Sequence, residues 1–252
     1  MTRLMCGLLT VAALGIGSQD AAGQARTVRL ASATLGADRI FAILLPSRYA
    51  ESEQRYPVVY LFHGGGQDHT AFMSRTSFTP MARRHDVIVV MPAADRNYSG
   101  LSAEAQARFN DFIASELVDY VDSHYRTIAT PEGRAIAGLS MGGGIAAMTA
   151  LQHPKRFGTV GAFSAALRGN SQAAVQAAAG SATYFYVSCG TRDPLLTASR
   201  QFVERLAEHK LVHEFHEIPG GEHAWTVWDP EIAAFFDVLF TRAPWRTTGV
   251  RS

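Results

Sequence analysis

Short runs of consecutive apolar residues recur along the chain from residue 58 onward. Most of them are rich in β-branched or aromatic residues, as strands that are covered on both faces must be. We predict a strand at each run: VVYLFH (58–63), VIVVMP (87–92), GRAIAGL (133–139), TVGAFS (159–164), TYFYVSC (183–189) and HEFHEI (213–218).

Two strand-like segments, TVRLASATL and RIFAILLP, precede these runs. The turn residues Gly36-Ala37-Asp38 separate them. This arrangement predicts an antiparallel hairpin at one edge of the sheet.

Helical patterns alternate with the apolar runs. The longest covers residues 102–125, where Ser102 is a candidate N-cap and Glu104 falls in the first turn. Strands that alternate with helices need crossover connections, so we predict an α/β fold with a mostly parallel sheet and helices on both faces. The other predicted helices are 142–152, 194–209 and 230–240, and 169–182 is predicted to be a loop with a weak helix.

Composition indicates one globular domain, which we expect to cover residues 26–252. Of the 252 residues, 47% are hydrophobic and 18% are charged, a balance typical of a folded core. Lys and Arg number 23 against 22 Asp and Glu, so no basic field exists to bind nucleic acid. The sequence predicts neither a membrane span nor an oligomeric state.

The first 25 residues have the pattern of a removable secretory signal. Arg3 precedes an apolar stretch over 4–17, and small residues follow up to Ala25. The alternatives are a buried helix and a membrane anchor, but this stretch is too short to cross a bilayer. We therefore expect a secreted or periplasmic protein in which Cys189, a predicted buried apolar residue, remains without a cysteine partner.

One serine stands between spaced glycines at the end of the run 133–139. The pentad Gly138-Leu139-Ser140-Met141-Gly142 fits GxSxG and lies between a predicted strand and a predicted helix. A sharp strand-to-helix turn crowds the positions two before and two after the serine, so both need glycine. We predict that Ser140 is a nucleophile; the alternative is a glycine-rich turn that only packs the helix on the strand.

A serine nucleophile needs a base, and His223 is the best candidate among the histidines. It lies in a glycine loop directly after the last predicted strand. The run HEFH in that strand lacks the helical spacing of a zinc site. We expect no metal and no cofactor, because a serine nucleophile with a histidine base needs neither. Other histidines lie inside predicted elements, where we expect structural roles: His209, His213 and His216.

The acid that orients the base is predicted to be Asp193. It directly follows the run 183–189 and lies between Ser140 and His223 in the chain, an order that serine hydrolases use. Ligand sites in parallel sheets lie beyond the carboxyl ends of the strands, so the three side chains are expected to meet there. Glu222 and Asp229 remain alternatives for the acid.

Backbone N–H groups are predicted to stabilise the oxyanion that forms when the serine attacks. Met141 follows the nucleophile and supplies one donor. The glycines after the run 58–63 supply the other, with Gly65 favoured over Gly64, because backbone without side chains approaches a substrate closely. His63 is expected to brace this loop by hydrogen bonding.

With these residues in place, the chain resembles the α/β-hydrolase group called "putative esterase", the esterase D and feruloyl esterase group, and within it carbohydrate esterase family 1. That group includes feruloyl esterases, acetyl xylan esterases, S-formylglutathione hydrolases and mycolyltransferases. The resemblance runs from Phe41 to Phe240. It rests on VVYLFHGGGQDHTAF, ELVDYVDSHYRT, RAIAGLSMGGGIAAMTALQHPKRFGTVGAFSAAL, VSCGTRDPLL and PGGEHAWTVWDPEIAAFF.

The resemblance implies an α/β-hydrolase fold, the same catalytic residues, and a serine esterase that forms an acyl-enzyme; the signal pattern adds the expectation that this esterase is secreted. It implies acetyl or feruloyl esters of plant polysaccharides, or similar small esters, as substrates. Trp225 and Trp228 fall where the family has aromatic residues, so each is a candidate for the acyl or sugar pocket or for core packing. The segments after Pro92 and Ser164 are short for a feruloyl esterase, which indicates an open cleft.

Other functions stay open on the same sequence. Acyl transfer of the mycolyltransferase kind, hydrolysis of a siderophore ester, and hydrolysis of a peptide or thioester would use the same three residues. A non-catalytic binding protein with a hydrolase fold is the alternative outside enzymes.

Overall fold

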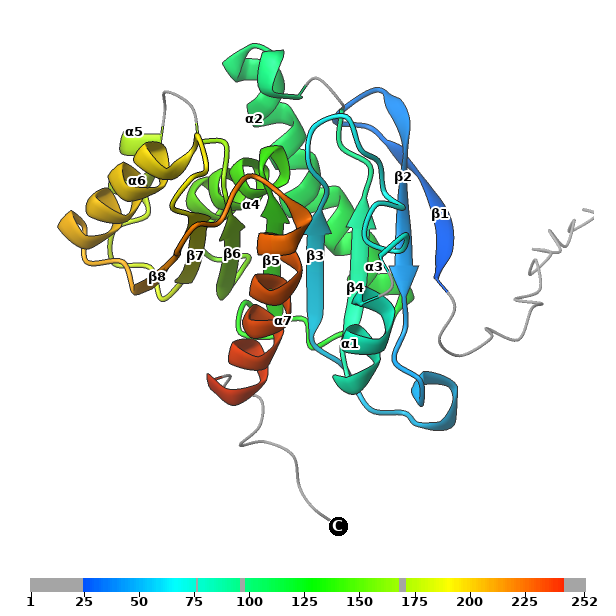
Figure 1. The fold of residues 1–252 in the computed structure, drawn as a ribbon. Helices are drawn as coiled ribbons and strands as arrows, with labels where there is room; N and C mark the ends of the chain where they lie inside the picture. The colour runs from blue at the N-terminus through cyan, green and yellow to red at the C-terminus, as the bar shows by residue number, and fades with distance from the viewer. Residues whose placement is uncertain (1–24, 76, 96–97, 168–170, 243–252) are drawn as a thin grey trace, which may run out of the picture.

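The computed structural model describes residues 25–75, 77–95, 98–167 and 171–242. The predicted signal segment lies outside these residues, apart from Ala25. Within them, eight strands form one sheet in the order β1-β2-β4-β3-β5-β6-β7-β8 (Figure 1).

Six of these strands confirm the apolar runs, each to within one residue at either end. Strands β3, β4, β5, β6, β7 and β8 pair in parallel along the sheet. The sheet is therefore mostly parallel, as the alternation of strands and helices predicts. The bounds are β3 (Val58–Phe62), β4 (Ile88–Pro92), β5 (Arg134–Leu139), β6 (Thr159–Phe163), β7 (Tyr184–Gly190) and β8 (His213–Ile218).

The predicted hairpin is present at the edge of the sheet, with its turn three residues earlier than expected. Strands β1 (Arg26–Ser32) and β2 (Ala37–Leu44) pair antiparallel, and β2 also pairs antiparallel with β4. Ala37 pairs with Ser32, so this residue belongs to the ladder rather than to the turn. Gly36 closes the turn with a φ of +63°, a conformation that glycine adopts without strain.

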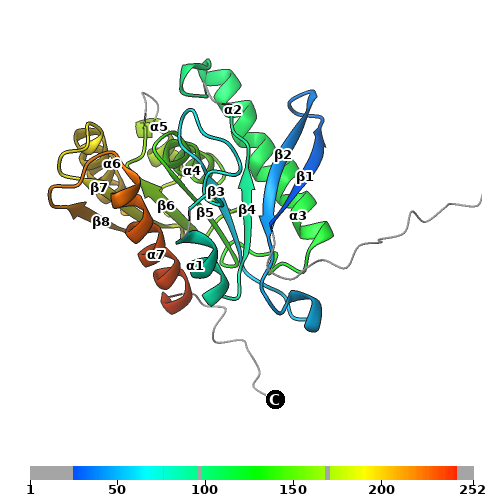
Figure 2. The same cartoon turned by 45° about the vertical axis from the view of Figure 1, so that its right-hand side comes forward.

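Helices cover both faces of the sheet. Figure 2 shows α1 and α7 together on one of these faces. Buried side chains of α2 to α6 pack in one core cluster, and those of α1 and α7 pack in the other. Ser102 caps α2 as predicted, because its Oγ accepts a hydrogen bond from Ala105 N–H at 3.2 Å. The bounds are α1 (Phe78–Arg84), α2 (Ala103–Phe112), the π-helix η3 (Ile113–Leu117), α3 (Val118–His124), α4 (Met141–Gln152), α5 (Ser171–Ala177), α6 (Leu196–Glu208) and α7 (Trp225–Arg242), with 3₁₀ turns at η1 (Tyr49–Glu51) and η2 (Tyr98–Gly100).

Two helices differ from the sequence prediction. Helix α1 was not predicted, because its seven residues carry too little periodic pattern. Helix α7 begins at Trp225 instead of residue 230, and Pro230 lies inside it. Pro230 lies near the start of the helix. Because proline has no backbone N–H, one hydrogen bond to the first turn is missing, and the helix continues beyond it.

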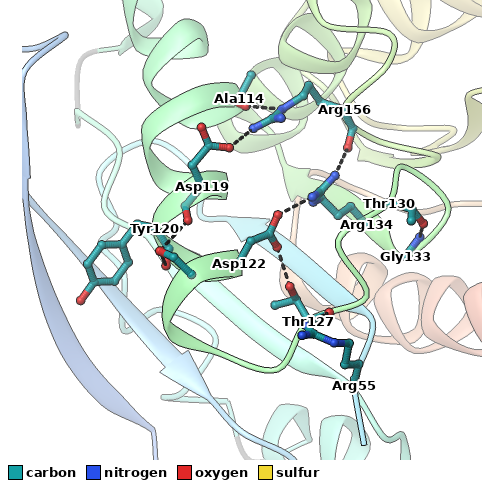
Figure 3. Close-up of polar contacts among 11 residues, drawn as sticks. Arg55, Ala114, Asp119, Tyr120, Asp122, Thr127, Thr130, Gly133, Arg134 and Arg156 are labelled. Carbon is teal, nitrogen blue, oxygen red and sulfur yellow. Dashed lines mark hydrogen bonds and ion pairs between the residues drawn. The ribbon is translucent and has the colours of Figure 1, made fainter.

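A network of ion pairs lies at the amino end of β5, the end of this strand away from Ser140 (Figure 3). Arg134, the first residue of β5, forms an ion pair with Asp122 of α3. The same carboxylate accepts a hydrogen bond from the Thr127 hydroxyl at 2.6 Å. Arg156 forms an ion pair with Asp119 one helical turn away. The network ties α3 to the strand that carries Ser140.

Asp122→Asn should lower the free energy of unfolding by about 3–5 kcal/mol, because it leaves the Arg134 guanidinium, whose side chain is only 6% exposed, without its charged partner. The control is Asp38→Asn in the exposed Arg29–Asp38 pair, which should cost less than about 1 kcal/mol. Urea denaturation of both variants measures the difference. Equal losses would show that the buried network does not hold the helix to the strand.

Candidate active site

Ser140 lies on a sharp turn between β5 and α4. Its backbone has φ 54° and ψ −117°, a strained conformation for a residue with a side chain. Two backbone hydrogen bonds hold it there: Ser140 N–H donates to Phe163 O, and Ala166 N–H donates to Ser140 O, each at 2.8 Å. Both partners belong to β6 or to the loop after it, so the neighbouring strand fixes the turn.

The glycines on either side of Ser140 leave no room for side chains. A Cβ on Gly142 would lie 2.2 Å from Phe62 O at the end of β3, and a Cβ on Gly138 would lie 2.4 Å from the carbonyl carbon of Gly142. Real Cβ atoms do not approach backbone so closely. The turn therefore packs directly on the end of β3, and this crowding is the physical reason for the GxSxG spacing.

The structure brings Ser140, His223 and Asp193 together at the carboxyl ends of β5, β8 and β7. His223 Nε2 lies 2.9 Å from Ser140 Oγ, and His223 Nδ1 lies 2.8 Å from Asp193 Oδ2. The side chain of Asp193 is fully buried, and its Oδ1 accepts a hydrogen bond from Leu195 N–H at 2.8 Å. These partners let Nδ1–H donate to the carboxylate and leave Nε2 as the acceptor for the serine proton.

Close backbone packing fixes the acid relative to the imidazole. Arg192 N–H donates to Gly221 O at 2.8 Å, which joins the loop after β7 to the loop after β8. A Cβ on Gly190 would lie 2.2 Å from Gly221 O, so the end of β7 touches the loop after β8 at a pair of glycines. The positions of Asp193 and His223 are thus coupled through the backbone as well as through their side chains.

The two alternative acids have no such contact with His223. Glu222 is exposed and Asp229 lies in α7; among the described residues, neither has a hydrogen bond to the imidazole. The histidines of β8 have local partners instead. His213 Nδ1 lies 2.8 Å from Leu211 O, and the His216 ring stacks on Tyr186.

The structure distinguishes the two glycines considered for the oxyanion. Gly64 N–H donates to Gln67 Oε1 at 3.0 Å, so it is already engaged. Gly65 is exposed, a Cβ there would meet nothing within 4 Å, and its N–H has no acceptor among the described residues. Met141 is the first residue of α4, where the N–H has no partner within the helix. Gly65 and Met141 are therefore the candidate donors.

His63 holds the loop that carries these glycines. Its Nε2 accepts a hydrogen bond from Ala94 N–H at 3.0 Å, and its Nδ1 lies 2.8 Å from Gly64 O. These partners fix the tautomer with the proton on Nδ1. The buried ring thus links the loop after β3 to the loop after β4.

The two tryptophans have different surroundings. Trp228 is buried, its Nε1–H donates to Ser164 Oγ at 3.0 Å, and its ring stands perpendicular to the His223 ring with centroids 4.8 Å apart. Trp225 is half-buried and packs edge-on against Phe72. Ser164, which sequence reasoning did not identify, thus anchors the indole that packs on the imidazole. No sequence signal marks it, because the contact joins residues 64 positions apart.

Within the described ranges, no group of three or more His, Cys, Asp or Glu side chains is arranged to hold a metal ion. Across the same part of the chain, no helix has the length and apolar character needed to cross a membrane.

Cys189 is buried at the end of β7, and this burial raises the pKa of its thiol.

The chain matches known esterases in sequence. A family model described as "Putative esterase" matches residues 32–237. An esterase of Mycobacterium tuberculosis H37Rv is 29% identical over 236 residues, which cover 71% of this chain and 51% of the relative. An endo-1,4-beta-xylanase/feruloyl esterase of Xylanibacter ruminicola is 26% identical over 216 residues, which cover 77% of this chain and 29% of the relative. The chain thus spans about half, or less, of the length of these relatives.

Solved structures share the fold. An S-formylglutathione hydrolase from Staphylococcus aureus superposes with a TM-score of 0.73 at 22% identity, covering 86% of this chain and 96% of that chain. This likeness confirms the α/β-hydrolase fold.

The bond between Trp228 and Ser164 should be measurable as a coupling in stability. Trp228→Phe and Ser164→Ala each remove one partner of a buried hydrogen bond, so each should lower the free energy of unfolding by about 1–3 kcal/mol. The double variant should lose less than the sum of the two, by about 0.5 kcal/mol or more. Urea denaturation of the four proteins gives this coupling, and strict additivity would show that the bond contributes nothing.

Proposed function

This chain belongs to the "Putative esterase" family, and we propose that it hydrolyses carboxylic esters with Ser140 as the nucleophile. The observation that carries the proposal is the pair of short contacts at His223, 2.9 Å to Ser140 Oγ and 2.8 Å to Asp193 Oδ2. These two contacts support the proposed roles of Ser140 as nucleophile, His223 as base and Asp193 as the acid that orients the base.

In the first step, Ser140 Oγ attacks the ester carbonyl while His223 Nε2 takes the hydroxyl proton. The imidazolium that forms is stabilised by the buried carboxylate of Asp193. The carbonyl oxygen becomes an oxyanion and accepts hydrogen bonds from Gly65 N–H and Met141 N–H, each donor contributing about 10²–10³ in rate.

The intermediate collapses when His223 returns the proton to the departing alcohol. The acyl group is then esterified to Ser140. A water molecule gives a proton to His223 and attacks the acyl carbonyl, and the oxyanion that forms is stabilised by the same N–H groups. When the bond from the acyl group to Ser140 Oγ breaks, His223 returns the proton to Oγ, which releases the carboxylic acid and regenerates the serine.

The proposed substrates are acetyl or feruloyl esters of plant polysaccharides, or similar small esters. The relative from Xylanibacter ruminicola, named for both xylanase and feruloyl esterase activity, supports this class. We also propose that residues 1–25 direct secretion and that residues 26–252 act as one catalytic domain; the apolar stretch after Arg3 supports the first point.

Ser140→Ala should keep the fold and lower kcat for 4-nitrophenyl acetate by a factor of about 10⁴ or more, because it removes the hydroxyl that lies 2.9 Å from His223 Nε2. Ser123→Ala, at an exposed serine on α3, is the matched control and should retain wild-type turnover. Initial rates at saturating ester, with circular dichroism as the check on folding, make the comparison. Wild-type turnover by Ser140→Ala would refute the assignment.

Asp193→Asn should lower kcat by about 10³–10⁴, because an amide both removes the charge and permits the wrong imidazole tautomer. Glu222→Gln and Asp229→Asn test the two alternative acids and should each change kcat by less than about 3-fold, since neither carboxylate is bonded to His223. A large loss in either of these variants, with near-normal activity in Asp193→Asn, would transfer the role of the acid to the other residue.

A further inference from the structure

A shallow groove is connected to the candidate active site through contacts of two of its lining residues, Gln67 and Trp225. Its volume is about 200 Å³, and it lies between the loop after β3 and the first residue of α7. Both walls connect to the catalytic residues: Gln67 binds Gly64 N–H beside the candidate oxyanion donors, and Trp225 packs on Trp228, which packs on His223. The lining residues are Gln67, Asp68, Ala71, Ser74, Arg75 and Trp225.

Arg75 is held in this groove by an aromatic ring. Its guanidinium carbon lies 4.4 Å from the centroid of the Trp225 ring, a cation–π contact that fixes the plane of the charge. Trp225 is itself held edge-on by Phe72 and Trp228. The cation is thus positioned by rigid neighbours rather than by a flexible stem alone.

The donors of Arg75 lack acceptors among the described residues. Its Nε is buried without a hydrogen-bond partner, and the guanidinium forms no ion pair there. The great majority of buried polar groups in proteins have a hydrogen-bond partner, so a guanidinium with an unpartnered Nε needs an explanation. A planar guanidinium bonds a carboxylate through two parallel N–H groups, a geometry that suits a ligand at this place.

The groove also contains an anion, but its charge is better satisfied than that of Arg75. Asp68 Oδ1 accepts hydrogen bonds from the Thr70 hydroxyl at 2.6 Å and from Thr70 N–H at 2.8 Å. These bonds lower the pKa of Asp68 and keep it ionised. Gln67 uses its Oε1 on Gly64, so its Nε2 donors are the part of the amide available to a ligand.

We propose that this groove binds a carboxylate on the substrate, with Arg75 as the residue that recognises it. The proposal rests on the proposed function, because it assigns a further contact to the ester that Ser140 attacks. The carboxylate can belong to the acyl part or to the alcohol part of that ester. Its oxygens accept hydrogen bonds from the guanidinium, and Gln67 Nε2 is a second donor on the same wall.

Two matched pairs of esters separate these sources. For the acyl part, 4-nitrophenyl hydrogen adipate carries the carboxylate and 4-nitrophenyl methyl adipate is its neutral partner. For the alcohol part, 4-acetoxybenzoate carries the carboxylate and methyl 4-acetoxybenzoate is its neutral partner. For each pair, the ratio of kcat/KM for the charged ester to kcat/KM for the neutral ester is measured in the wild type and in each variant.

Arg75→Met removes the charge and keeps an unbranched stem over Trp225, so the ratio should fall about 10- to 100-fold for one of the two pairs, the loss of one charge-assisted contact. The pair that responds identifies the part of the ester that carries the carboxylate. Arg75→Lys keeps the charge but not the paired donors and should recover only part of the ratio. Raising the salt concentration should lower the wild-type ratio for the same pair.

Arg48→Met is the matched control. Arg48 follows β2, whose end pairs with the start of β4, so this exposed cation lies at the opposite end of the sheet from the groove. Its ratios should equal those of the wild type. Wild-type ratios in Arg75→Met for both pairs, or an equal fall in Arg48→Met, would overturn the carboxylate site while leaving the esterase proposal intact. Absence of turnover of both neutral esters by the wild type would instead overturn the proposed function.

Discussion

The constraint on which the rest of the structure depends is the direct backbone contact between the turn at Ser140 and the end of β3. Gly142 touches Phe62 O so closely that no side chain fits between them. This contact sets the start of α4 beside His63, which begins the loop that carries Gly65. The positions of Ser140, the proposed nucleophile, and of Met141, a candidate oxyanion donor, thus depend on one close backbone contact. The strained backbone conformation of Ser140 is maintained at this contact by hydrogen bonds with β6 and with the loop after β6.

The imidazole is placed by a second set of contacts that is independent of this turn. The end of β7 touches the loop after β8 at Gly190 and Gly221, and Asp193 Oδ2 lies 2.8 Å from His223 Nδ1. Trp228 packs on the same ring from α7 and is anchored to the loop after β6. Contacts from the loops after β6, β7 and β8 hold the imidazole in place. It therefore lies between Ser140 and Asp193 without any movement of the chain. Such preorganisation is what general-base catalysis by a neutral imidazole requires.

Much of the fold could be predicted from the sequence, because consecutive apolar residues mark buried parallel strands and glycine marks close backbone approach. The strand bounds and the convergence of three distant side chains follow from those two rules, and the cap at Ser102 follows from the preference of serine for helix N-termini. Other features depend on contacts between residues far apart in the chain, which no local pattern records. The first turn of α7 ahead of Pro230, the Trp228–Ser164 bond and the position of Arg75 on Trp225 are of this kind. Helix α1 is short enough that packing, rather than periodicity, decides its conformation.

The most direct test of the account is to find which residue an organophosphate modifies. A fluorophosphonate reacts fastest with a serine that has a neighbouring base to remove its proton and N–H donors to stabilise the negative oxygen on phosphorus. Formation of the adduct therefore tests the nucleophile, the base and the oxyanion donors together. Peptide mapping by mass spectrometry should find a single adduct on Ser140, and the modification should be abolished by His223→Ala and by unfolding in urea. An adduct on another serine, or equal modification of Ser140 in the His223→Ala variant, would contradict the account.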